Sequence, residues 1–167
     1  RMEPYQRQRI TSFISPESDR DAFYNILQAR ISIGSGGLFG KGYAQGPQNV
    51  GRFLRVRHTD FIFSVIAEEF GFVGGMTVMV LIGVVVIRIL RGARMAADAL
   101  GSLICYGVAS FIFFQTFVSI GMNLSLMPVT GLTLPFISSG GTSLLSTLAG
   151  IGLAESVIMR SRSLTQS

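Results

Sequence analysis

The sequence predicts an all-α, polytopic integral membrane protein with three transmembrane helices and a large extracytoplasmic loop that carries short helices. Of its 167 residues, 49% are hydrophobic and only 14% are charged, which is too apolar a composition for a soluble domain of this size. The charged residues are also unevenly placed, since none occurs from Phe70 to Ile87 or from Ala99 to Ala154. Gaps of this length are long enough for helices that cross a bilayer.

The first 58 residues are polar, rich in glycine and basic, and we assign them to the extracytoplasmic loop. They contain nine Lys or Arg residues and four acidic residues. Apolar residues recur at helical spacing around residues 5–12 and 21–31, which predicts two short amphipathic helices. Glycine is too frequent from Gly34 to Gly46 for a long helix there.

The rest of the chain alternates between predicted spans and the segments that join them. The predicted spans are residues 59–89, 100–121 and 142–159. The first and third spans are followed by arginines, so the positive-inside tendency places residues 90–99 and 160–167 in the cytoplasm. The N-terminal loop and residues 122–141 then share the outer face of the membrane.

Residues 122–141 form a loop that contains Pro128, Pro135 and several glycines. Proline and glycine at these positions prevent one continuous helix. Non-helical backbone at membrane depth is tolerated only where it is buried in protein or lines a cavity. We therefore expect this loop to dip toward a functional site.

Two features of the first span concern helix packing. Gly71 and Gly75 form a small-xxx-small pair that would let another helix approach closely, although the alternative is a tolerated kink. Glu68 and Glu69 lie two turns inside the span, so at least one of them must face protein or water rather than lipid. We expect these two acids to pair internally and to support the site rather than to catalyse.

Asp60 stands where the polar loop becomes an apolar helix, within the stretch RVRHTDFIFSVIAEEF. One interpretation is a carboxylate at a helix N-terminus, where the macrodipole favours negative charge. The other is a base that nearby cations keep ionised, ready to accept a proton from a hydroxyl group. In that case His58 and Thr59 would orient Asp60.

The basic residues before Asp60 are candidate contacts for a phosphate-bearing substrate. Arg52, Arg55 and Arg57 offer planar paired donors that suit a diphosphate, although each could instead snorkel to lipid headgroups. The glycine-rich stretch IGSGGLFGKG, with Lys41, could contact phosphate through backbone amides or form a plain flexible turn. It is not a nucleotide-binding P-loop, because Gly42 stands where that motif needs Ser or Thr.

Composition also limits cofactors and partners. With one His and one Cys, a dedicated transition-metal site is not expected, whereas a divalent cation (Mg or Mn) shared between Asp60 and substrate phosphates is compatible with the sequence. The net charge of +5 is not accompanied by a recognisable nucleic-acid module. We expect membrane lipids or a phosphate-bearing substrate as partners, and no nucleic acid.

At these residues the sequence resembles the SEDS family (shape, elongation, division and sporulation), which contains the RodA, FtsW and SpoVE peptidoglycan polymerases. The matching stretches follow one another over nearly the whole chain: YNILQARISIGSGGLFGKG, GPQ, RFL, HTDFIFSVIAEEFGFVGG and PVTGLTLPFISSGGTSLL. The FISPESDRDAFYN pattern is closer to the RodA elongation type. The chain departs from the usual family pattern at a few positions: Pro47, Arg55, Val56, Thr133 and Ser139.

The resemblance implies a ten-span enzyme of the bacterial cytoplasmic membrane that polymerises lipid II on the outer face, for cell elongation or division. It also implies a class B penicillin-binding protein as partner, and lipid II and an undecaprenyl-diphosphate-linked glycan as substrates. The HTD match places the family's essential aspartate at Asp60. The candidate substrate contacts are then Lys41, Gln48, Arg52, Arg55, Arg57, His58 and Thr59.

This chain, which opens on RMEPYQRQR without an initiator Met or a signal peptide, looks like the C-terminal part of such a protein. We expect the piece alone to be inactive. Two other functions are compatible with the residue spacing. One is a lipid II flippase, and the other is a non-catalytic membrane scaffold of the cell-wall machinery.

Overall fold

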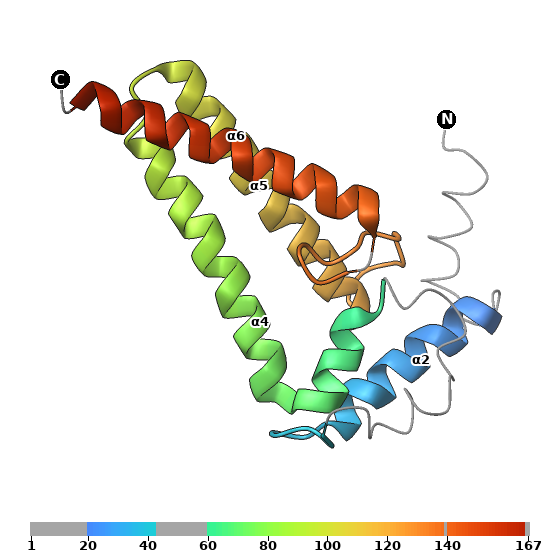
Figure 1. Ribbon diagram of the computed structural model, residues 1–167. Helices are drawn as coiled ribbons and strands as arrows, with labels where there is room; N and C mark the ends of the chain where they lie inside the picture. Colours follow the sequence, from blue (N-terminus) through green and yellow to red (C-terminus); the bar gives the residue numbers. More distant parts are fainter. Residues whose placement is uncertain (1–19, 43–59, 139, 166–167) are drawn as a thin grey trace, which may run out of the picture.

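The computed structural model describes residues 20–42, 60–138 and 140–165, and within them it contains helices and no strand (Figure 1). This confirms the predicted all-α class. The helices are α2 (Arg20–Ser35), α4 (Ile62–Arg94), α5 (Ala99–Asn123) and α6 (Gly141–Thr165). The predicted helix at residues 5–12 lies outside the described residues, whereas the one at 21–31 corresponds to α2.

Three of these helices, α4, α5 and α6, are long and apolar enough to cross a membrane, as predicted. Each of them ends later in the chain than the predicted span, whereas α4 begins at Ile62 rather than residue 59. α4 continues to Arg94 rather than residue 89, because long arginine side chains can reach the interface from within a helix. α5 continues to Asn123 rather than residue 121, because the Asn123 side chain finds hydrogen-bond partners inside the protein.

The three long helices pack around a shared apolar core in which α4 contacts both α5 and α6. Fully buried members of this core include Cys105 and Ile112. Large apolar side chains also cover the outside of the helices, among them Phe113 and Phe117, which stack with ring centroids 6.2 Å apart. So large an exposed apolar surface is unfavourable in water and suits contact with lipid.

α4 is divided by a sharp bend at Gly71 into a short segment, residues 62–70, and a long segment, residues 72–94 (Figure 1). Gly71 has φ 69° and ψ −164°, a backbone conformation that is essentially limited to glycine. Of the two interpretations of this glycine, the kink is the one found.

A tight turn at residues 36–42 lies against the bend and replaces the helical hydrogen bonds that are lost there. Two of its carbonyls accept hydrogen bonds from amides that begin the long segment, and two of its amides donate to carbonyls that end the short segment. The four bonds are Phe72 N to Gly37 O (2.9 Å), Val73 N to Leu38 O (3.2 Å), Lys41 N to Glu68 O (3.0 Å) and Gly42 N to Glu69 O (3.1 Å). The turn therefore caps both helix ends in one contact.

This contact between the turn and α4 explains why the stretch from Gly34 to Gly42 needs glycine. A Cβ added at Gly40 would collide with the carbonyl oxygen of Glu69, and the Gly40 amide donates to Gly36 O at 2.8 Å. The backbone amides of residues 40–42 are thus bonded to protein carbonyls, which favours a structural turn over a phosphate-binding loop.

The arginines at the end of α4 and the carboxylate of Asp60 lie at opposite ends of the helical bundle. A Cβ added at Gly92 would touch Ile158, so the C-terminal ends of α4 and α6 lie side by side, with Arg88 and Arg91 exposed there. Figure 1 shows the beginning of α4 and the loop between α5 and α6 at the opposite end. Asp60 lies at this second end.

Candidate active site

Asp60 lies at the meeting point of α4 and the loop between α5 and α6. It is 6% exposed and immediately precedes Phe61, the N-cap residue of α4. A Cβ added at Gly131 would lie 3.8 Å from Asp60 Oδ2, so the carboxylate lies against the backbone of this loop. The sequence predicts that the loop dips toward the site, and the structure brings the two together.

Asn123, the last residue of α5, fixes the backbone on both sides of the α4 N-cap. It is fully buried. Its Nδ2 donates to the carbonyl oxygen of Asp60 at 3.0 Å and to that of Ser119 at 2.8 Å. Its Oδ1 accepts from the amide of Ser64 at 3.2 Å and from the Ser64 hydroxyl at 2.7 Å. Phe61 has no side chain that could cap the helix, and Asn123 supplies that function from another helix.

Gln115 holds the loop from the same side of α5. Its Nε2 donates to the carbonyl oxygen of Thr133 at 2.9 Å and to the hydroxyl of Ser143 at 3.1 Å. The Thr133 hydroxyl in turn donates to Ser143 Oγ at 2.7 Å. A buried amide therefore ties the loop that carries Gly131 to the first turn of α6, and this limits how far the loop can move from Asp60.

Apart from Asp60, the residues of these two networks are not among the candidates predicted from the sequence, although the spacing of the polar residues in α5 gives a signal. Gln115, Ser119 and Asn123 follow one another at intervals of four residues in an otherwise apolar span. This spacing places them on one face of a helix, and polar residues at membrane depth usually face protein. All three are buried.

Lys41 is the one candidate substrate contact before Asp60 that lies within the described residues, and the structure does not bring it to the carboxylate. Its amide bonds to the carbonyl of Glu68, at the far end of the short segment of α4. A rise of about 1.5 Å per residue puts the two ends roughly 12 Å apart. The other candidate contacts lie outside the described residues: Gln48, Arg52, Arg55, Arg57, His58 and Thr59.

The residues predicted to support the site from within the first span are two acids and two glycines, and they are buried or closely packed. Glu68 and Glu69 are 0% and 7% exposed, which agrees with the expectation that at least one of them faces protein. A Cβ at Gly71 would meet the backbone of Leu38, and one at Gly75 would lie 3.4 Å from the ring of Phe63. The neighbours of these two glycines are therefore a turn and a side chain of α4 itself, rather than the other helix that the small-xxx-small pair suggests.

Among the described residues, no group of three or more His, Cys, Asp or Glu side chains lies close enough together to hold a metal ion. A divalent cation shared between Asp60 and substrate phosphates stays a prediction.

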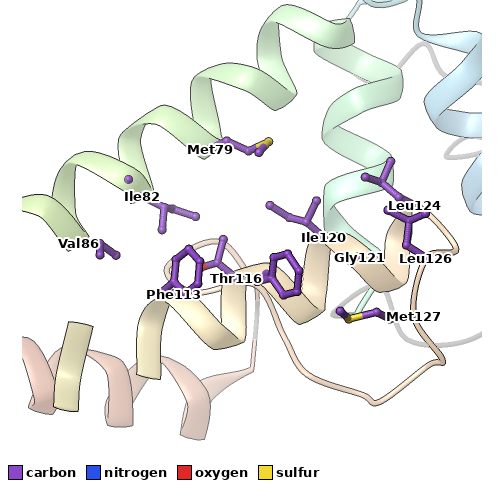
Figure 2. A pocket seen from close by; sticks show the side chains of 12 residues that line it. Met79, Ile82, Val86, Phe113, Thr116, Ile120, Gly121, Leu124, Leu126 and Met127 are labelled. Carbon is purple, nitrogen blue, oxygen red and sulfur yellow. The ribbon is translucent and has the colours of Figure 1, made fainter. Parts of the chain in front are cut away.

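A separate apolar groove of about 390 Å³ runs between the long segment of α4 and α5. Figure 2 shows Met79, Ile82 and Val86 of α4 on one side and Phe113 and Ile120 of α5 on the other. The hydroxyl of Thr116, which also lines the groove, already donates to the carbonyl of Ile112 at 2.7 Å. The groove therefore presents an almost wholly apolar lining.

Comparison with known proteins places these features in a family. The family model described as "Cell cycle protein", which covers FtsW, RodA and SpoVE, matches residues 1–163. The chain is 42% identical over 170 residues to the peptidoglycan glycosyltransferase MrdB of Escherichia coli K12, covering 99% of this chain and 45% of MrdB. It is also 42% identical over 160 residues to the peptidoglycan glycosyltransferase RodA of Treponema pallidum, covering 95% and 37% respectively.

A solved structure shares the arrangement of the helices. It is described as "Structural coordination of polymerization and crosslinking by a peptidoglycan synthase complex", with a TM-score of 0.74, 34% identity, and coverage of 99% of this chain and 44% of that chain. This chain thus spans less than half the length of these relatives. The matches confirm the resemblance found in the sequence, and the chain belongs to the FtsW/RodA/SpoVE (SEDS) family of multi-pass membrane proteins, on its RodA-like side.

Proposed function

We propose that this chain carries the catalytic carboxylate of a peptidoglycan glycosyltransferase, which polymerises lipid II into glycan strands at the outer face of the bacterial cytoplasmic membrane. The observation that supports this most is the placement of Asp60. Its carboxylate is largely buried and lies against the loop at Gly131, and its backbone is fixed by a buried amide. Relatives named peptidoglycan glycosyltransferases match almost the whole chain.

The proposed reaction is glycosyl transfer with inversion. The 4-hydroxyl oxygen of the acceptor sugar attacks the anomeric carbon of a lipid-diphosphate-linked glycan, and Asp60 accepts the hydroxyl proton. The new glycosidic C–O bond forms as the C–O bond to the diphosphate breaks, and undecaprenyl diphosphate leaves with the electron pair. Because the leaving group carries its own negative charge, the protein must supply position and cationic stabilisation more than a strong acid.

The cationic stabilisation is assigned to Arg52, Arg55 and Arg57, whose paired donors suit a diphosphate. We propose that His58 and Thr59 orient Asp60 and that Gln48 contacts the substrate. Lys41, at the other end of the short α4 segment, could reach only a more distant part of a long substrate.

The outer face is proposed from the charges. Arg88, Arg91 and Arg94 follow one another at the end of the bundle opposite to Asp60, and arginines next to short turns favour the cytoplasm. The substrate glycan would then meet Asp60 on the exterior. We further propose a class B penicillin-binding protein as partner, since the related solved structure couples polymerization to crosslinking.

The direct test uses the full protein that contains this chain, purified with its penicillin-binding partner, and lipid II as substrate. We expect Asp60→Asn to reduce the rate of glycan polymerisation by at least about 100-fold, the usual range for loss of a general base. Substrate binding should persist, because the amide has the same shape. The matched control is Asp98→Asn, the same substitution at an exposed acid of the α4–α5 turn, which should retain the wild-type rate.

Gel analysis of product chain length also separates this proposal from its rivals. A lipid II flippase or a scaffold makes no glycosidic bond, so the purified protein with its partner inhibited at the crosslinking step would release no glycan strands. Wild-type polymerisation by Asp60→Asn would remove Asp60 from the proposed catalytic role.

A further inference from the structure

The side-chain amide of Asn123 uses all of its hydrogen-bonding capacity, which is more than packing alone requires. An Asn side chain can donate two hydrogen bonds from Nδ2 and accept two at Oδ1, and Asn123 forms all four, to Asp60, Ser119 and Ser64. The orientation of the amide is determined by its partners. A flipped amide would place its oxygen against two carbonyl oxygens and its hydrogens against the Ser64 amide hydrogen.

The bond to the Asp60 carbonyl is unusual in its location. Asp60 precedes the N-cap, so its carbonyl oxygen lies outside the hydrogen-bonding pattern of α4, whose first bonds are made to Phe61 O by the amides of Ser64 and Val65. A buried carbonyl of this kind needs a partner, and Asn123 provides it from α5. The direction of the Asp60 backbone is thereby set by a helix to which Asp60 does not belong.

The same amide also holds Ser64, the third residue of the short α4 segment. Asn123 is therefore hydrogen-bonded to the backbone on both sides of Phe61, at Asp60 and at Ser64, four residues apart. Phe61 itself is 4% exposed and packs with Ala29 of α2 and Val129 of the loop. Rotation of the Asp60 backbone would break the bond to Asn123, displace the buried Phe61 ring, or do both.

We propose that Asn123 is a positioning residue for the reaction, which holds the Asp60 carboxylate against the Gly131 loop at the distance needed for proton transfer. Asn123 does not touch the substrate and acts through Asp60. This inference rests on the proposed function, because it assigns Asn123 a part in the chemistry of Asp60. Misplacement of a catalytic group by about 1 Å can lower the rate by about 100-fold.

The test uses Asn123→Ala and Asn123→Asp in the full protein with its penicillin-binding partner and lipid II. Asn123→Asp has nearly the same volume and keeps an acceptor for Ser64, while it loses both donors. For each variant we expect kcat to fall about 100-fold with KM for lipid II within about threefold of wild type, since the groups assigned to substrate binding are untouched.

Two matched controls separate positioning from stability. Ser64→Ala removes one bond to Asn123 and leaves the bond to Asp60, so its kcat should fall far less than that of Asn123→Ala. Ile112→Ala makes a cavity in the same helix at a fully buried residue and should lower the thermal midpoint while keeping kcat within about threefold of wild type. An equal loss of kcat in Ile112→Ala would show that Asn123 is merely structural.

The inference and the proposed function fail in different ways. Wild-type kcat in both Asn123 variants, together with an inactive Asp60→Asn, would overturn the inference alone. Wild-type polymerisation by Asp60→Asn would overturn the proposed function, and the role of Asn123 with it. We expect Asn123→Ala to lower the thermal midpoint both in the wild-type protein and in an Asp60→Asn background. In the Asp60→Asn background it should not lower the residual rate of polymerisation further.

Discussion

The bend at Gly71 offers a direct test of how the short α4 segment is held in place. The substitution is Gly71→Ala. Alanine would have to adopt φ 69° and ψ −164°, which costs about 1–3 kcal/mol. Its Cβ would also lie 2.6 Å from the carbonyl carbon and oxygen of Leu38, and overpacking of this kind costs a further 1–3 kcal/mol or so.

The chain could avoid the collision by moving the 36–42 turn away from the bend. It would then lose the four backbone hydrogen bonds that join the turn to α4. At about 0.5–1.5 kcal/mol each, these bonds contribute about 2–6 kcal/mol. The first route therefore costs about 2–6 kcal/mol of unfolding free energy, and the second costs about 3–9 kcal/mol because the backbone strain at residue 71 remains in it.

The assay is the thermal midpoint of the full protein in detergent. About 1 kcal/mol shifts the midpoint by roughly 2–4 °C in a protein of 150–250 residues and by about half as much in one twice as long, so we expect Gly71→Ala to lower it by at least about 2 °C. The control is Gly107→Ala, since a Cβ at this exposed glycine of α5 has open space around it. If the two variants had equal midpoints, the turn would not be stabilising the bend.

Two further predictions concern the loop that faces Asp60. Gln115→Ala removes the donor to the Thr133 carbonyl and to Ser143. It should cost about 1–3 kcal/mol of unfolding free energy and slow polymerisation, because the loop loses its restraint. An unchanged thermal midpoint and an unchanged rate would contradict the proposed restraint. Thr133→Val removes the hydroxyl bond to Ser143 and the long 3.5 Å bond from Gln115 Nε2 to the same hydroxyl, but it leaves the bond from Gln115 to the Thr133 carbonyl. Its cost should be about 1 kcal/mol. A larger loss than that of Gln115→Ala would show that the hydroxyl, rather than the buried amide, is the main restraint on the loop.

The three spans could be predicted from the sequence because lipid imposes a simple requirement. A helix in the bilayer needs about 20 residues without charge, and the gaps after Phe70 and Ala99 meet it. The bend at Gly71 could not be located in the same way. A glycine inside an apolar helix is common, and the partner that makes this one a break is a turn about thirty residues earlier in the chain.

The site was predicted in part. Asp60 could be singled out because a carboxylate at the start of an apolar helix is conspicuous, and the proline loop because it cannot be helical. Their contact at Gly131 depends on tertiary packing that no spacing rule contains. Gln115 and Asn123 were missed because each is a single polar residue whose partners lie on other elements, and only their shared spacing with Ser119 gave a signal.

The most direct test of the central claim, that the Asp60 carboxylate acts on the exterior of the cell, is labelling of single cysteines in intact spheroplasts. Thr130→Cys reports on the loop beside Gly131, and Ala97→Cys reports on the turn between α4 and α5; both positions are exposed. The background replaces Cys105 and any other cysteine. We predict that a membrane-impermeant maleimide labels Thr130→Cys before lysis and Ala97→Cys only afterwards. The reverse pattern would place Asp60 on the cytoplasmic side and contradict the proposed function.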